Sequence, residues 1–302
     1  MSKTGLKTKL SKGIAILRAG EFRMLYWRAN MDKIIERMIK KYPNKLIIKI
    51  ACFQITEKCN LRCKDCSQLM HYYKKRECTD IDEAIRYMDA LMERVDFIGD
   101  FAIMGGEPFL YKNLPRILEH ASKYKSKYGI LKTNTNGTIV PSTDVLKALK
   151  KSGIVVHISD YGDTSICLNE LVTALKEYKI PFSVDAVAWY ETSQLRENGG
   201  PELAKEIYAK CCRSDEKRGS VNGGKYYNCA FLGRGDKLRI FPSSADNYVD
   251  LLDEKVTAQD IKRYISSENA PPGCGYCSGI DKTKAIPVAE QLKEPLPYKA
   301  YD

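Results

Sequence analysis

The sequence predicts an α/β protein in which a partial parallel (β/α) barrel of the TIM type precedes a small cysteine-rich domain. Between residues 46 and 187, extended apolar runs alternate with amphipathic helical segments, and repeated βα units form parallel sheets with right-handed crossovers. Cysteines or polar motifs follow four successive apolar runs, at the ends of strands where parallel barrels carry their chemistry. The alternation stops near residue 200. We therefore expect a basic extension at 1–45, the barrel at 46–200, the cysteine-rich domain at 201–280 and a tail at 281–302.

The composition is that of an ordinary globular protein. Of the 302 residues, 44% are hydrophobic and 29% are charged, and no uninterrupted apolar run is long enough to span a bilayer. No apolar signal segment follows the basic first residues. Clustered cysteines in a chain that is not secreted indicate metal ligands rather than disulfides, and the chain has 11 cysteines. We expect a cytoplasmic protein.

Most of the net charge of +11 lies in the first 45 residues, which hold 12 Lys and Arg against three acidic residues. The segment Met24–Ile39 has apolar residues at helical spacing with basic residues among them, which predicts a basic amphipathic helix. We expect this helix to pack across the open end of the barrel with its charges in water. Peripheral contact with an anionic membrane surface is the alternative. We expect no nucleic-acid binding, because no RNA-binding signature accompanies the charge.

The alternating pattern places each element of the barrel. Five strands are expected, at Leu46–Gln54, Phe97–Met104, Gly129–Thr133, Val155–Ser159 and Phe182–Val187. Helices are expected between them, at Ile81–Val95, Leu114–Lys127, Ser142–Lys151 and Asn169–Tyr178. Thr79-Asp80 precedes the first helix and Ser142 with Asp144 begins the third, as capping residues do.

Three cysteines, Cys59, Cys63 and Cys66, lie on the loop that follows the first strand. A structural zinc site uses four protein ligands, whereas a cubane iron–sulfur cluster held by three thiolates leaves one iron open for another ligand. The spacing alone leaves three interpretations: an iron–sulfur cluster, a zinc knuckle, or cysteines that are simply buried.

The next strands end in polar motifs. Met104-Gly105-Gly106-Glu107-Pro108 follows the second strand, and its glycines would let the backbone approach a ligand closely while Glu107 offers a carboxylate to a cation. Asn136 follows the third strand, and Ser159 with Asp160 ends the fourth. Such residues also form routine turns and caps. Parallel strands would place all four motifs at one cavity.

Together, the cysteine triad and the glycine turn resemble the radical S-adenosylmethionine (SAM) superfamily. The resemblance implies that Cys59, Cys63 and Cys66 hold a [4Fe-4S] cluster whose open iron chelates SAM. It implies that Gly105, Gly106, Glu107 and Pro108 receive the amino group of SAM, and that Asn136, Ser159 and Asp160 contact its ribose and adenine. One departure is Asp65, which stands where the family usually has an aromatic residue before the third cysteine.

The cysteines after residue 200 indicate a second site. We expect a hairpin of Lys225–Cys229 and Leu238–Phe241 joined through Gly233-Arg-Gly-Asp, then a helix over Thr257–Ser267. With Cys274 and Cys277, this arrangement resembles the twitch domain, a short form of the SPASM domain. The resemblance implies an auxiliary [4Fe-4S] cluster held by Cys211, Cys229, Cys274 and Cys277, with Cys212 as the rival to Cys211. A four-cysteine zinc ribbon is the alternative.

The resemblance also implies the chemistry. The first cluster would reductively cleave SAM to a 5′-deoxyadenosyl radical, which would take a hydrogen atom from the substrate, with flavodoxin or ferredoxin as external electron donor. The spacing of the later cysteines and the count of five strands are similar to 2-deoxy-scyllo-inosamine dehydrogenase. We therefore expect a carbohydrate or aminocyclitol substrate, oxidised from alcohol to ketone with the auxiliary cluster as electron acceptor. A peptide maturase, a sugar epimerase and a zinc-stabilised scaffold are the alternatives; the substrate, the catalytic base and the oligomeric state stay open.

Overall fold

The computed structural model describes residues 19–186, 188–192, 195, 196, 199–211 and 218–302, and the chain divides into two compact units, 1–42 and 43–302. In the first unit, helix α2 runs over Ala19–Lys41. The helix predicted over Met24–Ile39 is confirmed and is longer than expected. Among the described residues, no helix is both long and apolar enough to cross a bilayer.

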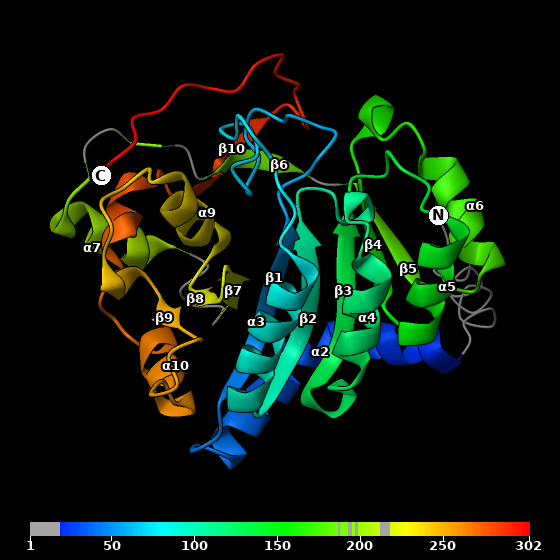
Figure 1. Ribbon diagram of the computed structural model, residues 1–302, viewed down its shortest axis with the longest axis horizontal. Coiled ribbons are helices and arrows are strands. Elements are labelled where there is room, and N and C mark those ends of the chain that lie inside the picture. Colours follow the sequence, from blue (N-terminus) through cyan, green and yellow to red (C-terminus); the bar gives the residue numbers. More distant parts are fainter. Residues whose placement is uncertain (1–18, 187, 193–194, 197–198, 212–217) are drawn as a thin grey trace, which may run out of the picture. The chain divides into compact units, whose positions relative to one another are not determined.

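The second unit contains a sheet whose central part is parallel (Figure 1). Its first five strands lie in the order β5-β4-β3-β2-β1, and each pairs in parallel with its neighbour. Their bounds are Ile47–Thr56 for β1, Phe97–Gly105 for β2, Tyr128–Thr135 for β3, Val155–Asp160 for β4 and Phe182–Ala186 for β5. All five predicted strands are therefore confirmed to within two residues, except that Val187, the predicted end of the fifth strand, lies outside the described residues.

Helices cover the face of this sheet seen in Figure 1, where α3 and α4 lie in front of β1 to β3. Their bounds are Ile81–Arg94 for α3, Leu114–Ser122 for α4, Thr143–Ser152 for α5 and Leu168–Glu177 for α6. Helix α3 begins as predicted, because the Asp80 side chain accepts hydrogen bonds from the amides of Asp82 and Glu83. Helix α4 ends five residues earlier than predicted, and a short 3₁₀ turn, Lys125–Lys127, follows it.

A sixth parallel strand, β7 (Arg218–Asn222), pairs with the opposite edge of β1, so that Ile50 faces Arg218 and Phe53 faces Val221. The count of five parallel strands was therefore too low. Two antiparallel strands extend the sheet, β8 (Lys225–Tyr227) on β7 and β9 (Val249–Asp250) on β8. Strand β1, which leads into the cysteine loop, is thus central in the sheet and has neighbours on both sides.

The predicted hairpin through Gly233-Arg-Gly-Asp is wrong. Those residues lie inside helix α9 (Ala230–Leu238), and the hairpin instead joins β7 to β8 through Gly223 and Gly224, which have φ of 58° and 76°. Two adjacent glycines at positive φ are typical of two-residue hairpin turns. The glycines of α9 are tolerated because they pack closely: a Cβ at Gly235 would lie 2.4 Å from the Phe241 ring.

A further group of elements belongs to the part of the chain that contains the later cysteines. They are α7 (Pro201–Lys210), α10 (Ala258–Ile265), the 3₁₀ turns Ala245–Asn247 and Pro272–Tyr276, and a second sheet of β6 (Trp189–Thr192) with β10 (Ile280–Ile286). The helix predicted over Thr257–Ser267 is confirmed as α10, which begins with a capping box of Thr257 and Asp260.

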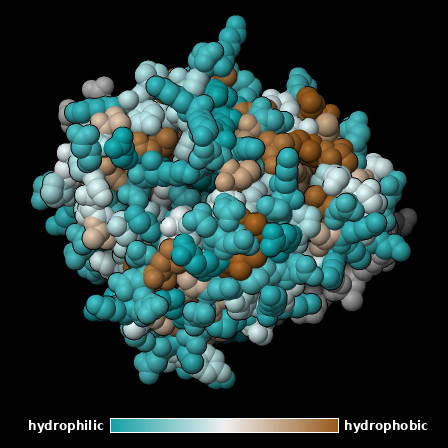
Figure 2. Space-filling view, viewed as in Figure 1, coloured by the Kyte–Doolittle hydropathy of each residue, from teal (hydrophilic) through white to brown (hydrophobic). Residues whose placement is uncertain are grey.

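The molecular surface, seen from the same side as in Figure 1, is largely hydrophilic, with hydrophobic areas between the polar ones (Figure 2).

Candidate functional site

The candidate site begins at the cysteine loop that leaves the end of β1. Cys63 is buried, and Cys59 and Cys66 are half-buried. One guanidinium holds the loop together: Arg76 Nη1 donates to the carbonyls of Cys59 (2.6 Å) and Leu61 (2.9 Å), and its Nη2 donates to Met70 (2.8 Å). Because these carbonyls lie at both ends of the loop, Arg76 fixes its curvature. The sequence offered no signal for this role.

The three thiols lie close enough to affect one another. Burial raises the pKa of Cys59 to about 12 and that of Cys63 to about 11, and it also raises the pKa of Cys66. Cys66 further raises the pKa of both other thiols. Among the residues that the structure describes, no three His, Cys, Asp or Glu side chains are arranged to bind one metal ion. Three mutually interacting thiols, one buried and two half-buried, suit a cluster in which each thiolate binds a different iron, and iron would supply the positive charge that thiolates need here.

The glycine turn after β2 packs directly on the cysteine loop. The amide of Gly106 donates to Thr56 O (3.0 Å), and the amide of Glu107 donates to Lys58 O (2.7 Å). A Cβ at Gly106 would lie 2.5 Å from Lys58 O and 2.8 Å from Cys59 Cβ. Both distances are shorter than those at which a Cβ atom contacts its neighbours in folded proteins. In the structure these glycines let the end of β2 approach the cysteine loop. That they also let the backbone approach a ligand stays a prediction.

Glu107 joins the second and third strand ends. Its side chain is fully buried, and its two carboxylate oxygens accept from different amides, Oε1 from Phe109 (3.1 Å) and Oε2 from Asn136 (2.9 Å). Burial raises the pKa of Glu107 to about 7, although the hydrogen bonds from both amides oppose that shift. The side chain predicted to meet a cation therefore also holds two loops in place.

The predicted ribose and adenine residues follow on the next two strand ends. Asn136 Nδ2 lies 3.8 Å from Cys59 Sγ and 3.2 Å from Asn60 Oδ1. Ser165 Oγ donates to the carbonyls of Asn136 (2.8 Å) and Ser159 (3.3 Å), which ties the ends of β3 and β4 together. The structure thus brings the Asn136 side chain to Cys59, whereas Ser159 is connected to Asn136 through the Ser165 hydroxyl.

The Asp160 side chain makes a hydrogen bond within its own loop, because its Oδ1 accepts from the amide of Gly162 at 2.9 Å. Beside it lies Tyr161, an aromatic side chain that no sequence motif indicated. Burial raises the pKa of Tyr161, and the charges of Cys66, Cys63 and Cys59 raise it further. The Tyr161 ring also meets the Trp189 ring edge-on, with 5.4 Å between centroids. The loop after β4 therefore carries an aromatic side chain, whereas Asp65 occupies the position before the third cysteine.

A buried ionic network lies beneath the cysteine loop. Arg234 on α9 is only 2% exposed, and its Nη2 donates to Gln54 Oε1 (2.8 Å) and Thr56 O (3.1 Å). Its Nη1 lies 3.5 Å from Glu57 Oε1, which Lys237 Nζ approaches to 2.5 Å. Helix α9 therefore holds the segment from which the cysteine loop departs. The sequence predicted this residue in the turn of a hairpin.

The later cysteines form a second group. Burial raises the pKa of Cys274, and nearby Cys229, Cys277 and Cys211 raise it further, so these thiols lie near one another. Cys212, the rival ligand, lies outside the described residues. Cys59 and Cys66 from the first group, and Cys229, Cys274 and Cys277 from the second, pack against one apolar cluster that includes Leu69, Met70, Tyr227, Phe231 and Phe241. The two thiol groups thus border the same apolar cluster.

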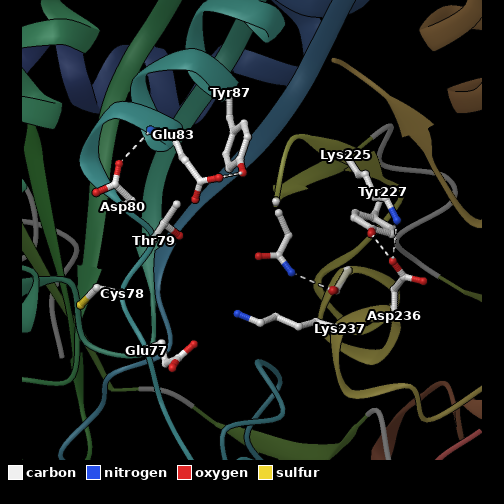
Figure 3. A pocket seen from close by; sticks show the side chains of 13 residues that line it. Glu77, Cys78, Thr79, Asp80, Glu83, Tyr87, Lys225, Tyr227, Asp236 and Lys237 are labelled. Carbon is white, nitrogen blue, oxygen red and sulfur yellow. Dashed lines mark hydrogen bonds and ion pairs between the residues drawn. The ribbon is translucent and has the colours of Figure 1, made fainter. Parts of the chain in front are cut away.

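A pocket of about 360 Å³ lies between the segment before α3 and the β7–β8 hairpin with α9 (Figure 3). Lys237 extends into it from α9, opposite Glu77, while Asp236 accepts from Lys225 (3.1 Å) and from the Tyr227 hydroxyl (2.7 Å). None of the cysteines or predicted SAM contacts of the first site lines this pocket. We therefore do not assign it to SAM.

A comparison with protein families matches the first part of the second unit. Residues 53–160 match the family model described as the Radical SAM superfamily, a range that runs from β1 through β4 and contains all three cysteines of the first loop. A GTP 3′,8-cyclase of Clostridium botulinum is 23% identical over 269 residues, covering 82% of this chain and 80% of that protein.

Two solved structures are similar at low identity. The crystal structure of BtrN in complex with AdoMet and 2-DOIA is 16% identical with a TM-score of 0.47, covering 81% of this chain and 98% of that one. Native anSMEcpe with bound AdoMet and Cp18Cys peptide is 21% identical with a TM-score of 0.37. The match covers 46% of this chain and 42% of that chain, so it spans less than half of anSMEcpe.

Proposed function

We propose that the radical SAM domain at residues 53–160 binds its [4Fe-4S] cluster through Cys59, Cys63 and Cys66 and works with an auxiliary cluster to oxidise a sugar-like alcohol to a ketone. The observation that carries the proposal is the link between three strand ends. Glu107 after β2 accepts from the amide of Asn136 after β3, and the Asn136 side chain reaches Cys59 after β1. A group bound at the cysteines would therefore lie beside the polar residues predicted for SAM.

When bound, the cluster and SAM supply the hard chemistry, the one-electron cleavage that yields a 5′-deoxyadenosyl radical able to abstract a substrate hydrogen atom. The chain's own residues shape and hold the site. Arg76 fixes the curvature of the cysteine loop, Glu107 aligns the turns after β2 and β3, and Tyr161 places a ring on the loop after β4. We propose that Tyr161 takes over the adenine packing that the family obtains from the residue before the third cysteine.

The oxidative outcome rests on the second thiol group. Cys211, Cys229, Cys274 and Cys277 offer four thiolates, which would bind every iron of a cubane cluster and leave none open for a substrate. Such a cluster suits electron transfer, and both thiol groups border one apolar cluster. An acceptor there would take the electron that remains after a substrate radical loses its hydroxyl proton.

A second candidate substrate class is a nucleotide. The chain matches a protein named GTP 3′,8-cyclase over 82% of its own length. GTP therefore belongs in any substrate screen beside sugars, aminocyclitols and peptides.

Anaerobic reconstitution with iron and sulfide tests the cluster assignment. We expect about eight irons in the wild type and about four in a Cys59/Cys63/Cys66→Ala variant, which should no longer cleave SAM. Cys52, Cys78 and Cys167 belong to neither thiol group. A Cys52/Cys78/Cys167→Ala variant is therefore the matched control, and we expect it to keep all its iron. Bound zinc without sulfide would instead return the chain to the zinc-scaffold class.

The substrate screen uses deuterium. A deuterated substrate should transfer its label to 5′-deoxyadenosine, and a ketone product should appear in equal amount. Label transfer from GTP with a cyclised product would replace the dehydrogenase proposal by the nucleotide one. Transfer from a peptide, or inversion of a sugar without oxidation, would favour the maturase or the epimerase.

A further inference from the structure

A segment far along the chain crosses the cysteine loop. The amide of Lys64 donates to Glu290 O and the amide of Leu292 donates to Arg62 O, both at 2.9 Å, so that Cys63 and Gln291 face each other in an antiparallel bridge. We call residues 289–301 the strap. In Figure 1 it is the red trace that follows β10.

The strap is anchored along its length. The amide of Leu296 donates to His71 O (2.9 Å), just after the cysteine loop, and the amide of Tyr301 donates to Arg239 O (2.8 Å), just after α9. The Tyr298 ring packs against Tyr72 with 5.7 Å between centroids. These contacts fix the register in which Gln291 meets Cys63.

The side chain of Gln291 points its amide nitrogen at the cysteine sulfur. Its Oε1 accepts from the Arg62 amide at 2.8 Å, and its Nε2 lies 3.2 Å from Cys63 Sγ and 2.6 Å from Ala289 O. A backbone N–H can only donate and a carbonyl can only accept, so the oxygen must face Arg62 and the NH₂ group must face Ala289. The same orientation directs an N–H at the sulfur of Cys63.

We propose that Gln291 is a positioning residue that donates a hydrogen bond to the Cys63 thiolate of the bound cluster and thereby stabilises the reduced cluster. The inference rests on the proposed function, because it takes Cys63 as a cluster ligand. Reduction adds negative charge that the thiolates share, and an N–H donor stabilises the more negative state. Hydrogen bonds to the cluster sulfurs are among the features that set the reduction potential.

The test is a potentiometric titration of the reconstituted protein, followed by electron paramagnetic resonance. The cluster of interest is recognised because its spectrum changes when SAM is added. We expect Gln291→Leu, which removes the donor at similar size, to shift the midpoint potential of this cluster to a more negative value. Gln291→Glu keeps an acceptor for Arg62 but places a second oxygen at the sulfur, and it should shift the potential at least as far.

The matched control is Glu290→Gln, which loses the 3.5 Å ion pair between Glu290 and Lys64 but leaves the Gln291 amide in place. Its potential should equal that of the wild type. Unchanged potentials in both Gln291 variants would overturn the inference. Loss of the SAM-responsive cluster from both variants, with the control still loaded, would also overturn it, because Gln291 would then be needed for binding. A wild type without this cluster would instead refute the proposed function.

Discussion

Replacing Glu107 with glutamine should abolish a pH dependence of stability that arises from one buried carboxyl group. Burial raises the pKa of Glu107 from 4.5 to about 7. Between these values the folded protein keeps a proton that the unfolded chain has released. Its contribution to stability is therefore complete below pH 4.5, falls as the pH rises, and is lost above about pH 7. A shift of about 2.5 pKa units corresponds to about 3 kcal/mol across this window.

The Glu107→Gln substitution also changes the hydrogen bonds to two amides. This effect on stability must be separated from the effect of pH. The carboxylate accepts from the amides of both Phe109 and Asn136, whereas a glutamine has one oxygen and would turn its NH₂ group toward the other amide. That mismatch costs about 1–3 kcal/mol at every pH. At pH 7 the two effects oppose each other and are of similar size. The slope with pH, and not the stability at one pH, is therefore the informative quantity.

The assay is urea unfolding of the cluster-free, reduced protein at a series of pH values from about 4.5 to 8. The difference in free energy of unfolding, wild type minus Glu107→Gln, should fall by about 3 kcal/mol over this range. Other titrating groups cancel in the difference. A flat difference for Glu107→Gln would refute the raised pKa.

Three further predictions concern other contacts of the site. Gly106→Ala should destabilise the fold by about 1–3 kcal/mol in urea unfolding, because its Cβ would lie 2.5 Å from a carbonyl of the cysteine loop; an unchanged midpoint would show that the turn can move away. Arg234→Met should cost about 3–5 kcal/mol by leaving buried Glu57 and Thr56 O without their guanidinium partner, and adding Glu57→Gln should recover part of the loss. Cys211→Ala should lower the iron content of the auxiliary site while Cys212→Ala leaves it unchanged; the reverse result would reassign the ligand.

The sequence was informative where the pattern is local. Each of the five predicted strands carries its own apolar run, and each motif follows its strand directly, so adjacency in the chain became adjacency at the edge of the sheet. Asp80 was recognisable as a cap for the same reason. Cys59 follows β1 and Asn136 follows β3, which are parallel strands with β2 between them, so their grouping followed from the parallel order of the sheet.

The errors arose where tertiary contacts override local signals. Gly233-Arg-Gly-Asp has the composition of a turn, yet it lies in a helix because Phe241 and Tyr227 pack closely against its glycines. Strand β7 was not predicted because it is short and its partner β1 is remote in the sequence. Arg234 and Gln291 carry no pattern of their own, because their roles depend on which carbonyl, carboxylate or sulfur the fold brings to them.

The central place of β1 has a consequence for biosynthesis. Gln54 of β1 and Ser220 of β7, which share a side-chain hydrogen bond, are 166 residues apart in the sequence. During translation the strand that leads into the cysteine loop therefore has β2 as a neighbour long before β7 exists, and one of its edges stays open for pairing with other chains. Closing such a long loop is slow. A cell that overproduces this chain should therefore benefit from chaperones, and iron delivery is best timed after the whole of the second unit has been synthesised.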